Sequence, residues 1–190
     1  MSDEMIVEFC SPTLAGIKTG NLFSCECNDY KKLIKEVRRV NSILIKKGIK
    51  AIPVRCLNHR VLIYLYRPSF LKKDFCDKDT AILLKQLGYN VENMTECVIC
   101  LKNKLKKLKS NKEFPHEIGL FLGYPYEDVK GFIDNKGECS KCVGCWKVYG
   151  DVTRAENTFD RYKKCTSDYV SRFKGGMTLD ELAVCMKTSL

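Results

Sequence analysis

A cysteine stands directly before Ser-Pro in the stretch EFCSPTLAGIK, residues 8–18. The apolar run EMIVEF, which precedes this cysteine, predicts a short strand. Ser11 followed by Pro12 is typical of the N-cap and first turn of a helix. A helix N-terminus lowers the pKa of a nearby thiol and offers free N–H groups to an oxyanion. We therefore predict that Cys10 is a nucleophile held at the start of a helix.

A thiol nucleophile needs a base, and the chain has only two histidines. His59 falls in a predicted hairpin turn beside Asn58, where a polar residue needs no further explanation. His116 opens the predicted strand HEIGLFLG and is the candidate base. The order cysteine, then histidine about a hundred residues later, then a carboxylate or amide is that of papain-like folds, although the papain signature CGSCW is absent.

Two carboxylates are candidates for the group that orients the imidazole. Asp151 ends the predicted strand CWKVYGD, and an antiparallel pairing of that strand with HEIGLFLG brings Asp151 to His116. Asp128 lies in the first turn of the predicted helix EDVKGFI, where an acid is already favoured by the helix dipole. We prefer Asp151 and keep Asp128 as the alternative.

Two polar residues lie farther along the predicted helix after Cys10. Lys18 and Asn21 are possible substrate contacts there, and they are equally consistent with surface or capping residues.

The cysteine spacing supports a competing hypothesis. Two separated CxxC pairs can hold zinc in a tetrahedral site, and thiolates can also hold an iron–sulfur cluster. The first pair falls on a predicted helix, whereas the second group, in CSKCVGC, is flanked by glycines. The alternative function is thus a non-enzymatic zinc or iron–sulfur protein using Cys97, Cys100, Cys139, Cys142 and Cys145. A third possibility is a basic interaction module without any site.

The elements that must position these residues alternate between helix and strand. Apolar spacing predicts strands at 4–9, 49–57, 60–66, 116–123 and 145–150. Helices are predicted from residue 11, at 28–48, 77–88, around Leu101 to Leu108, and at 125–133, 153–174 and 178–187. We expect one α+β domain over residues 1–190, with helices packed on a small, mostly antiparallel sheet.

Composition limits the surroundings and the partners. The net charge is +10, from 33 Lys and Arg against 23 Asp and Glu, which favours acidic partners. Nucleic acid is not the expected partner, because no nucleic-acid motif accompanies the charge. The acidic start MSDEMIVEFC and the lack of a long apolar stretch predict a cytoplasmic protein without a membrane segment. Twelve cysteines in such a protein are expected to be reduced thiols.

Three stretches carry a resemblance to a family: CSPTLAGIKTGNLF, FPHEIGLFLGYPYEDVKGFI and CWKVYGD. They resemble an uncharacterised family of clostridial and other firmicute proteins known as a domain of unknown function. The likeness spans nearly the whole chain. A member of this type is also similar to papain-like amide synthetases such as that of closthioamide assembly, in nonribosomal peptide biosynthesis.

The second resemblance implies a fold and a reaction. The fold is papain-like, and a Cys-His-Asp site passes an acyl group through an acyl-enzyme to an amine, with Cys10, His116 and Asp151 or Asp128 in those roles. The donor is a pantetheine thioester on an acidic acyl or peptidyl carrier protein, and no cofactor is needed. The same residues serve a hydrolase when water is the acceptor, so synthetase and amidase both stay open.

Overall fold

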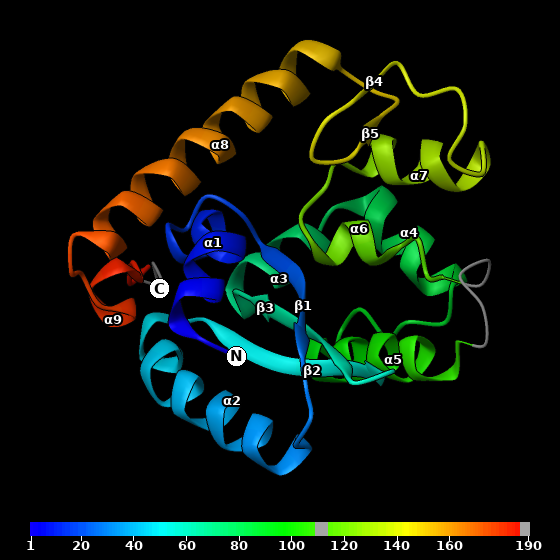
Figure 1. Cartoon of the computed structure of the whole chain (residues 1–190). Coiled ribbons are helices and arrows are strands. Elements are labelled where there is room, and N and C mark those ends of the chain that lie inside the picture. Colours follow the sequence, from blue (N-terminus) through cyan, green and yellow to red (C-terminus); the bar gives the residue numbers. More distant parts are fainter. Residues whose placement is uncertain (109–113, 187–190) are drawn as a thin grey trace.

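A three-stranded antiparallel sheet forms the centre of the protein (Figure 1). The structure, a computed structural model, describes residues 1–108 and 114–186. The strand order is β1 (Gly20–Glu26), β3 (Arg60–Tyr66), β2 (Lys50–Leu57). Asn58 and His59 both have positive φ angles, as a two-residue hairpin turn requires. The predicted hairpin between the second and third strands is confirmed.

The two faces of the sheet carry separate hydrophobic cores, because successive side chains of a strand point to opposite faces. Val61, Ile63 and Leu65 pack with two helices, α1 (Asp3–Leu14) and α2 (Tyr30–Leu44). Tyr64 and Tyr66 pack on the other face with α3 (Pro68–Phe75), α4 (Lys78–Gln86), α5 (Met94–Lys107) and α6 (Ile118–Phe121).

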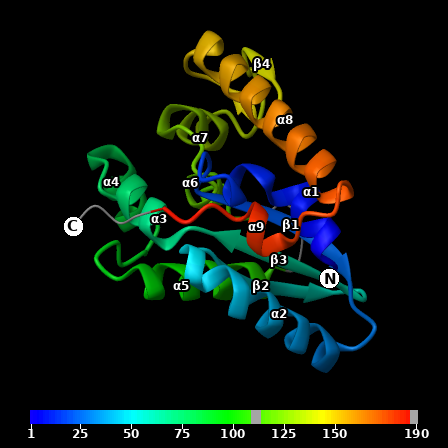
Figure 2. The same ribbon diagram turned by 90° about the vertical axis from the view of Figure 1, so that its left-hand side faces the viewer.

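The remaining elements lie farther from the sheet. They are the short 3₁₀ helix η1 (Ile45–Lys47), α7 (Tyr126–Asp134), the hairpin of β4 (Cys142–Val143) and β5 (Lys147–Val148), α8 (Val152–Lys174) and α9 (Leu179–Leu182). The long α8 starts beside the β4–β5 hairpin and runs along the outer side of α1 (Figures 1 and 2). The α1 helix is therefore enclosed between the sheet and α8.

One buried arginine joins distant parts of the chain. Arg67 is 1% exposed, and its guanidinium donates to the carbonyl oxygens of Thr13, Leu14, Lys47 and Val184 at 2.7–3.0 Å. The first two carbonyls lie at the C-terminal end of α1, where an unpaired carbonyl needs a donor. Arg67 thus ties α1, η1 and the C-terminal segment to the end of β3.

Three predicted strands are wrong or displaced. The run EMIVEF is part of α1, whose buried residues Ile6, Val7, Cys10 and Leu14 recur at helical spacing. HEIGLFLG forms a turn and the short α6 rather than a strand. In CWKVYG only Lys147–Val148 is a strand, and it pairs with β4 within a small hairpin. The strand β1, over residues expected to continue a helix after Ser11, was missed.

The architecture is a single α+β domain, with nine α-helices in the described ranges 1–108 and 114–186. None of those helices combines the length and the apolar character that crossing a membrane requires.

Candidate functional site

Cys10 does not lie at the start of a helix, and this corrects the geometric basis of the predicted nucleophile. The N-cap of α1 is Ser2, and Cys10 lies in the C-terminal half of the helix. Ser11 donates its hydroxyl to the carbonyl oxygen of Val7, and Pro12 lies inside the helix. Cys10 is 0% exposed in the core between α1 and the sheet. Burial raises the pKa of its thiol well above the usual value, although the nearby Lys18 charge lowers it.

Asp128, on α7, anchors the β4–β5 hairpin through hydrogen bonds. Its carboxylate accepts hydrogen bonds of 2.7 Å from the Trp146 indole N–H and from the backbone N–H groups of Tyr149 and Gly150. Asp128 is 3% exposed, so these three donors provide the polar contacts that a buried carboxylate needs. Asp128 therefore fixes the path of the chain after β5 and is more than a first-turn acid of α7.

Asp151 has a structural role at the start of α8. It is the N-cap of α8, and its side chain accepts from the backbone N–H of Arg154 at 3.0 Å. The predicted antiparallel pairing that would bring Asp151 to His116 is wrong, because residues 116–123 form no strand. His116 instead lies in the turn before α6.

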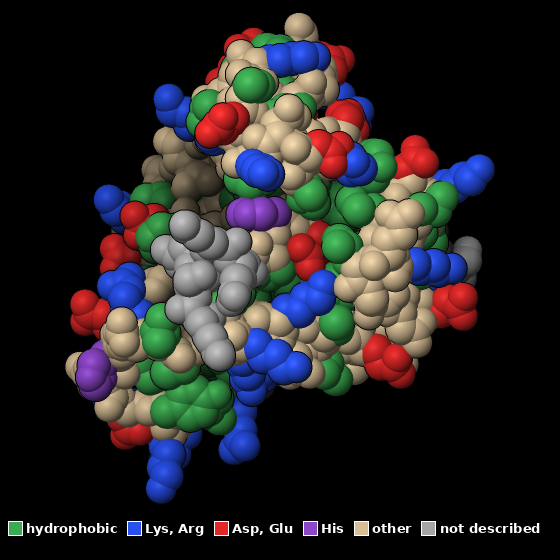
Figure 3. Space-filling model, turned by 90° about the vertical axis from the view of Figure 1, so that its right-hand side faces the viewer, with side chains coloured by type: hydrophobic (Ala, Val, Ile, Leu, Met, Phe, Trp, Pro, Cys, Tyr) green, Lys and Arg blue, Asp and Glu red, His purple; other side chains and the backbone are tan. Residues whose placement is uncertain are grey.

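The structure brings His116 to the same pocket as a different cysteine. His116 and Cys145 both line an apolar pocket of about 300 Å³, whose wall also includes Asp128 and Trp146. His116 is exposed and its ring lies 4.8 Å from the ring of Phe132. Figure 3 shows histidine side chains at the surface of this side of the molecule. The pocket combines a thiol and an imidazole in apolar surroundings.

Cys145 is an exposed thiol at the tip of the β4–β5 hairpin. Partial burial raises the pKa of this thiol, while the charge of Lys18 lowers it. Gly144 beside it has no room for a side chain, because a Cβ there would meet the ring of Phe159 on α8. The hairpin tip is thereby held against α8. From the sequence Cys145 was a candidate only as a metal ligand. The signal that could have singled it out is its position between a glycine and the only tryptophan of the sequence.

A second, larger cavity of about 890 Å³ opens on the other side of Trp146, between the α1–β1 turn, α3 and α8. Lys18 lies on its wall and is 7% exposed. Its backbone N–H donates to the carbonyl oxygen of Pro12, which fixes the turn after α1. Its Nζ atom lies 5.2 Å from the ring centre of Tyr124 and 5.5 Å from that of Tyr162. Burial lowers the pKa of Lys18 to about 8, against the opposing effects of Cys145 and Cys10.

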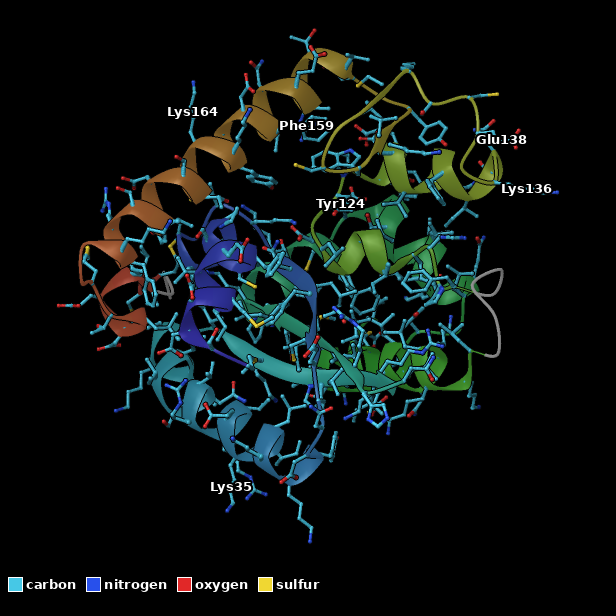
Figure 4. All side chains as sticks on the ribbon, viewed as in Figure 1. Lys35, Tyr124, Lys136, Glu138, Phe159 and Lys164 are labelled. Carbon is cyan, nitrogen blue, oxygen red and sulfur yellow. The ribbon has the colours of Figure 1, made fainter. Side chains whose placement is uncertain are left out.

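Aromatic rings separate the two hollows. Trp146 stacks on Tyr124 with ring centres 4.6 Å apart and meets the Phe159 ring edge-on at 4.5 Å. Figure 4 shows Tyr124 and Phe159 on the inner side of α8, whereas Lys164 on the same helix points outward. Burial raises the pKa of both Tyr124 and Tyr162 to about 12, so both phenols are neutral near pH 7.

Asn21 belongs to the scaffold. Its side-chain oxygen accepts from the Thr13 hydroxyl at 2.7 Å, which joins β1 to the end of α1. The residue lies in β1 rather than on a helix. Asn21 is not part of the wall of the large cavity that Lys18 lines. Lys18 and Asn21 are thus separated in role, with Lys18 at the cavity.

The cysteines proposed as metal ligands do not form one cluster. Cys97 and Cys100 lie on α5, where their thiols point to the carbonyl oxygens of Asn90 and Gly88. The other three lie in and before the β4–β5 hairpin. In the described part of the chain no three His, Cys, Asp or Glu side chains converge as metal ligands would. All twelve cysteines are free thiols.

Comparison with known proteins gives a family without an activity. No curated protein and no solved structure matches the chain. The family model described as "Protein of unknown function (DUF3793)" matches residues 6–183, so the resemblance noted in the sequence is confirmed at the level of the family. The chain belongs to this DUF3793 family.

Proposed function

We propose that this protein is a cysteine-dependent acyltransferase whose nucleophile is Cys145 and whose base is His116. The observation that carries the proposal is that these two side chains line one apolar pocket of about 300 Å³. Cys10, the nucleophile expected from sequence, is completely buried. A thiol must reach a substrate carbonyl before its ionisation matters, and Cys145, unlike Cys10, is accessible.

In the proposed reaction His116 takes the proton of the Cys145 thiol, and the sulfur attacks the carbonyl carbon of an acyl thioester. The donor thiol leaves with the proton from His116, and the acyl group remains on Cys145. An amine then attacks this thioester, forms the amide and restores the free thiol. Water in place of the amine gives hydrolysis.

The surroundings of Cys145 support this assignment. The apolar wall formed by Ile118, Val129 and Phe132 suits the hydrocarbon part of an acyl group. Lys18 places a positive charge near the thiol, which favours the thiolate. The net charge of +10 suits an acidic carrier protein that delivers the acyl group on a pantetheine arm.

The competing assignment is the papain-like one, with Cys10 as nucleophile. Under it α1 must move away from the sheet to expose the thiol, since Cys10 lies in the core with Ile6, Val7 and Leu14. The two assignments share His116 and the acyl-enzyme chemistry. They differ in which cysteine carries the acyl group.

The test is acyl-enzyme formation from an acyl thioester of N-acetylcysteamine, a small mimic of the pantetheine arm, followed by intact-protein mass spectrometry. Cys145→Ala should abolish the adduct, while Cys10→Ala and the hairpin control Cys142→Ala should retain it. His116→Ala should slow its formation on the order of 10²–10⁴-fold.

Peptide mapping of the acylated wild-type protein decides the case even when Cys10→Ala fails to fold. An acyl group found on Cys10 would replace Cys145 with Cys10 as the nucleophile. The lack of any adduct on either cysteine under conditions where the thioester is stable would refute acyl transfer.

A further inference from the structure

Lys18 is an amine held in a cavity without an acidic partner. It is 7% exposed, and within the described residues its Nζ atom forms no hydrogen bond or ion pair. A buried ammonium normally has a carboxylate or carbonyl partner, because taking a charge out of water is unfavourable. The two tyrosine rings beside Lys18 offer only the weaker cation–π attraction. The arrangement therefore disfavours the ammonium more than an exposed position does, and the pKa of Lys18 is lowered.

The groups that face the Lys18 amine do not stabilise its charged form with a fixed negative charge. Cys10 comes from α1, Cys145 from the hairpin, Tyr124 from the α6–α7 turn and Tyr162 from α8. All four are neutral when protonated, and the pKa of each is raised by burial. None supplies a fixed negative charge near pH 7.

The rest of the cavity wall carries charges of both signs, and three of its four acids accept hydrogen bonds from the protein. Asp128 holds three hydrogen bonds, Asp151 caps α8, and Asp74 accepts from the Thr19 hydroxyl. Burial also raises the pKa of Asp74. Of the four acids on the wall, Glu127 alone lacks a hydrogen-bonding role in the described residues.

Three cations besides Lys18 line the same wall. Lys73, Arg154 and Arg161 line the cavity, and none of them forms an ion pair with a carboxylate in the described part of the chain. Three such cations in one cavity favour a ligand that carries an anionic group. The volume of about 890 Å³ accommodates a small molecule.

We propose that Lys18 forms an imine with a small anionic carbonyl compound, of the 2-oxo acid class, bound in this larger cavity. The Nζ lone pair attacks the carbonyl carbon to give a carbinolamine. The carbonyl oxygen then leaves as water with the two hydrogens of the amine, and a carbon–nitrogen double bond remains. No oxidant or reductant takes part. The cavity adjoins the acyl-transfer pocket but is a different one, and the proposal stands whether or not Cys145 is a nucleophile.

The lowered pKa supports the reactivity. With a pKa of about 8, about a tenth of Lys18 is the free amine at pH 7, whereas an ordinary exposed lysine is almost entirely protonated. Desolvation next to apolar walls is a known way to activate a lysine nucleophile.

The test is reductive trapping with pyruvate and sodium cyanoborohydride at pH 7, followed by peptide mapping. Lys164 is the internal reference, because it is an exposed lysine on the outer side of α8 and points away from the cavity (Figure 4). We expect adduct at Lys18 to exceed that at Lys164 on the order of tenfold or more. The rate of trapping at Lys18 should rise with a midpoint near pH 8.

Variants separate covalent capture from charge. Lys18→Arg keeps the positive charge and should lose the adduct, while Lys164→Arg should leave trapping at Lys18 unchanged. Acetone, which has no anionic group, should give less adduct at Lys18 than pyruvate. Equal labelling of Lys18 and Lys164 in the wild-type protein, or a midpoint above pH 10 at Lys18, would overturn the proposal without any variant having to fold. Equal trapping of acetone and pyruvate would overturn the anionic class of the ligand.

Discussion

The regions around Cys10 and Cys145 are stabilised by different forces, and each force determines what its thiol can do. Around Cys10, helix α1 is enclosed by the sheet and α8, and the contacts are apolar. Around Cys145, a short hairpin is anchored by hydrogen bonds to the single carboxylate of Asp128 and by the Trp146 ring. The apolar region keeps its thiol buried and protonated, whereas the polar anchor leaves the hairpin tip open to a pocket.

The difference teaches that the neighbours of a cysteine in the sequence do not by themselves determine whether its thiol is reactive. The Ser-Pro after Cys10 is typical of a helix start, yet the helix begins at Asp3 because Ser2 caps it and Ile6, Val7 and Cys10 face the sheet. Cys145 is accessible because it lies at the tip of a hairpin, whatever residues surround it in the sequence. Its position depends on one buried carboxylate.

The largest effect that separates the two regions is expected at Asp128. Asp128→Ala leaves the partly buried donors of Trp146, Tyr149 and Gly150 without this acceptor, and we expect a loss of about 3 kcal/mol in the free energy of unfolding. Asp134→Ala, at an exposed position of the same helix, is the control and should change it by less than about 0.5 kcal/mol. Urea unfolding measures both. Similar values for the two variants would show that the hairpin does not depend on this anchor.

A smaller effect distinguishes the two cysteines themselves. Cys10→Ala removes a buried sulfur from the core and should lower the free energy of unfolding by about 1–2 kcal/mol. Cys145→Ala changes an exposed side chain and should alter it by less than about 0.5 kcal/mol. Both are measured by the same urea titration. The comparison between an apolar core and an open tip fails when the order of the two values is reversed.

The smallest effect is a pH dependence at Lys18, which lies near both cysteines. Its pKa is about 8 in the folded protein against 10.5 for the unperturbed side chain, so the unfolded chain binds the proton more tightly. Stability therefore rises with pH wherever folded Lys18 has lost its proton and unfolded Lys18 has not. Relative to Lys18→Met, the wild-type free energy of unfolding should increase by about 1 kcal/mol between pH 7 and pH 9.

The control for this titration is Lys164→Met, which removes a lysine charge from the outer side of α8. A wild-type protein that loses stability relative to Lys18→Met over the same pH range would show that the Lys18 amine is stabilised as the ammonium in the fold.

The elements that could be predicted from sequence are those whose pattern or turn is local. The helix at 28–48 is confirmed as α2 because Leu33, Val37, Val40 and Leu44 lie on one side of it whatever its neighbours are. The hairpin at Asn58-His59 is confirmed because the turn is local. The short apolar runs EMIVEF and HEIGLFLG were assigned wrongly, since runs of this length are compatible with a strand or a buried helix.

The site could be predicted only in part. His116, Asp128 and Lys18 were candidates from sequence and all line cavities. The partner of His116 could not be found, because the approach of the hairpin tip to the α6–α7 region depends on the tertiary anchor at Asp128. Lys18 was placed on a helix, and its position between two aromatic rings depends on α8, which is more than a hundred residues away in sequence.

Arg67 has a consequence for the order in which the protein is made. Its four carbonyl partners lie between 20 and 117 residues away along the chain. Contacts of such separation form slowly, because a long loop must close before they are gained. During synthesis the carbonyl of Val184 becomes available 117 residues after Arg67 itself. The guanidinium of Arg67 therefore lacks one of its four native partners until Val184 has emerged, so completion of this buried cluster is a late event in folding.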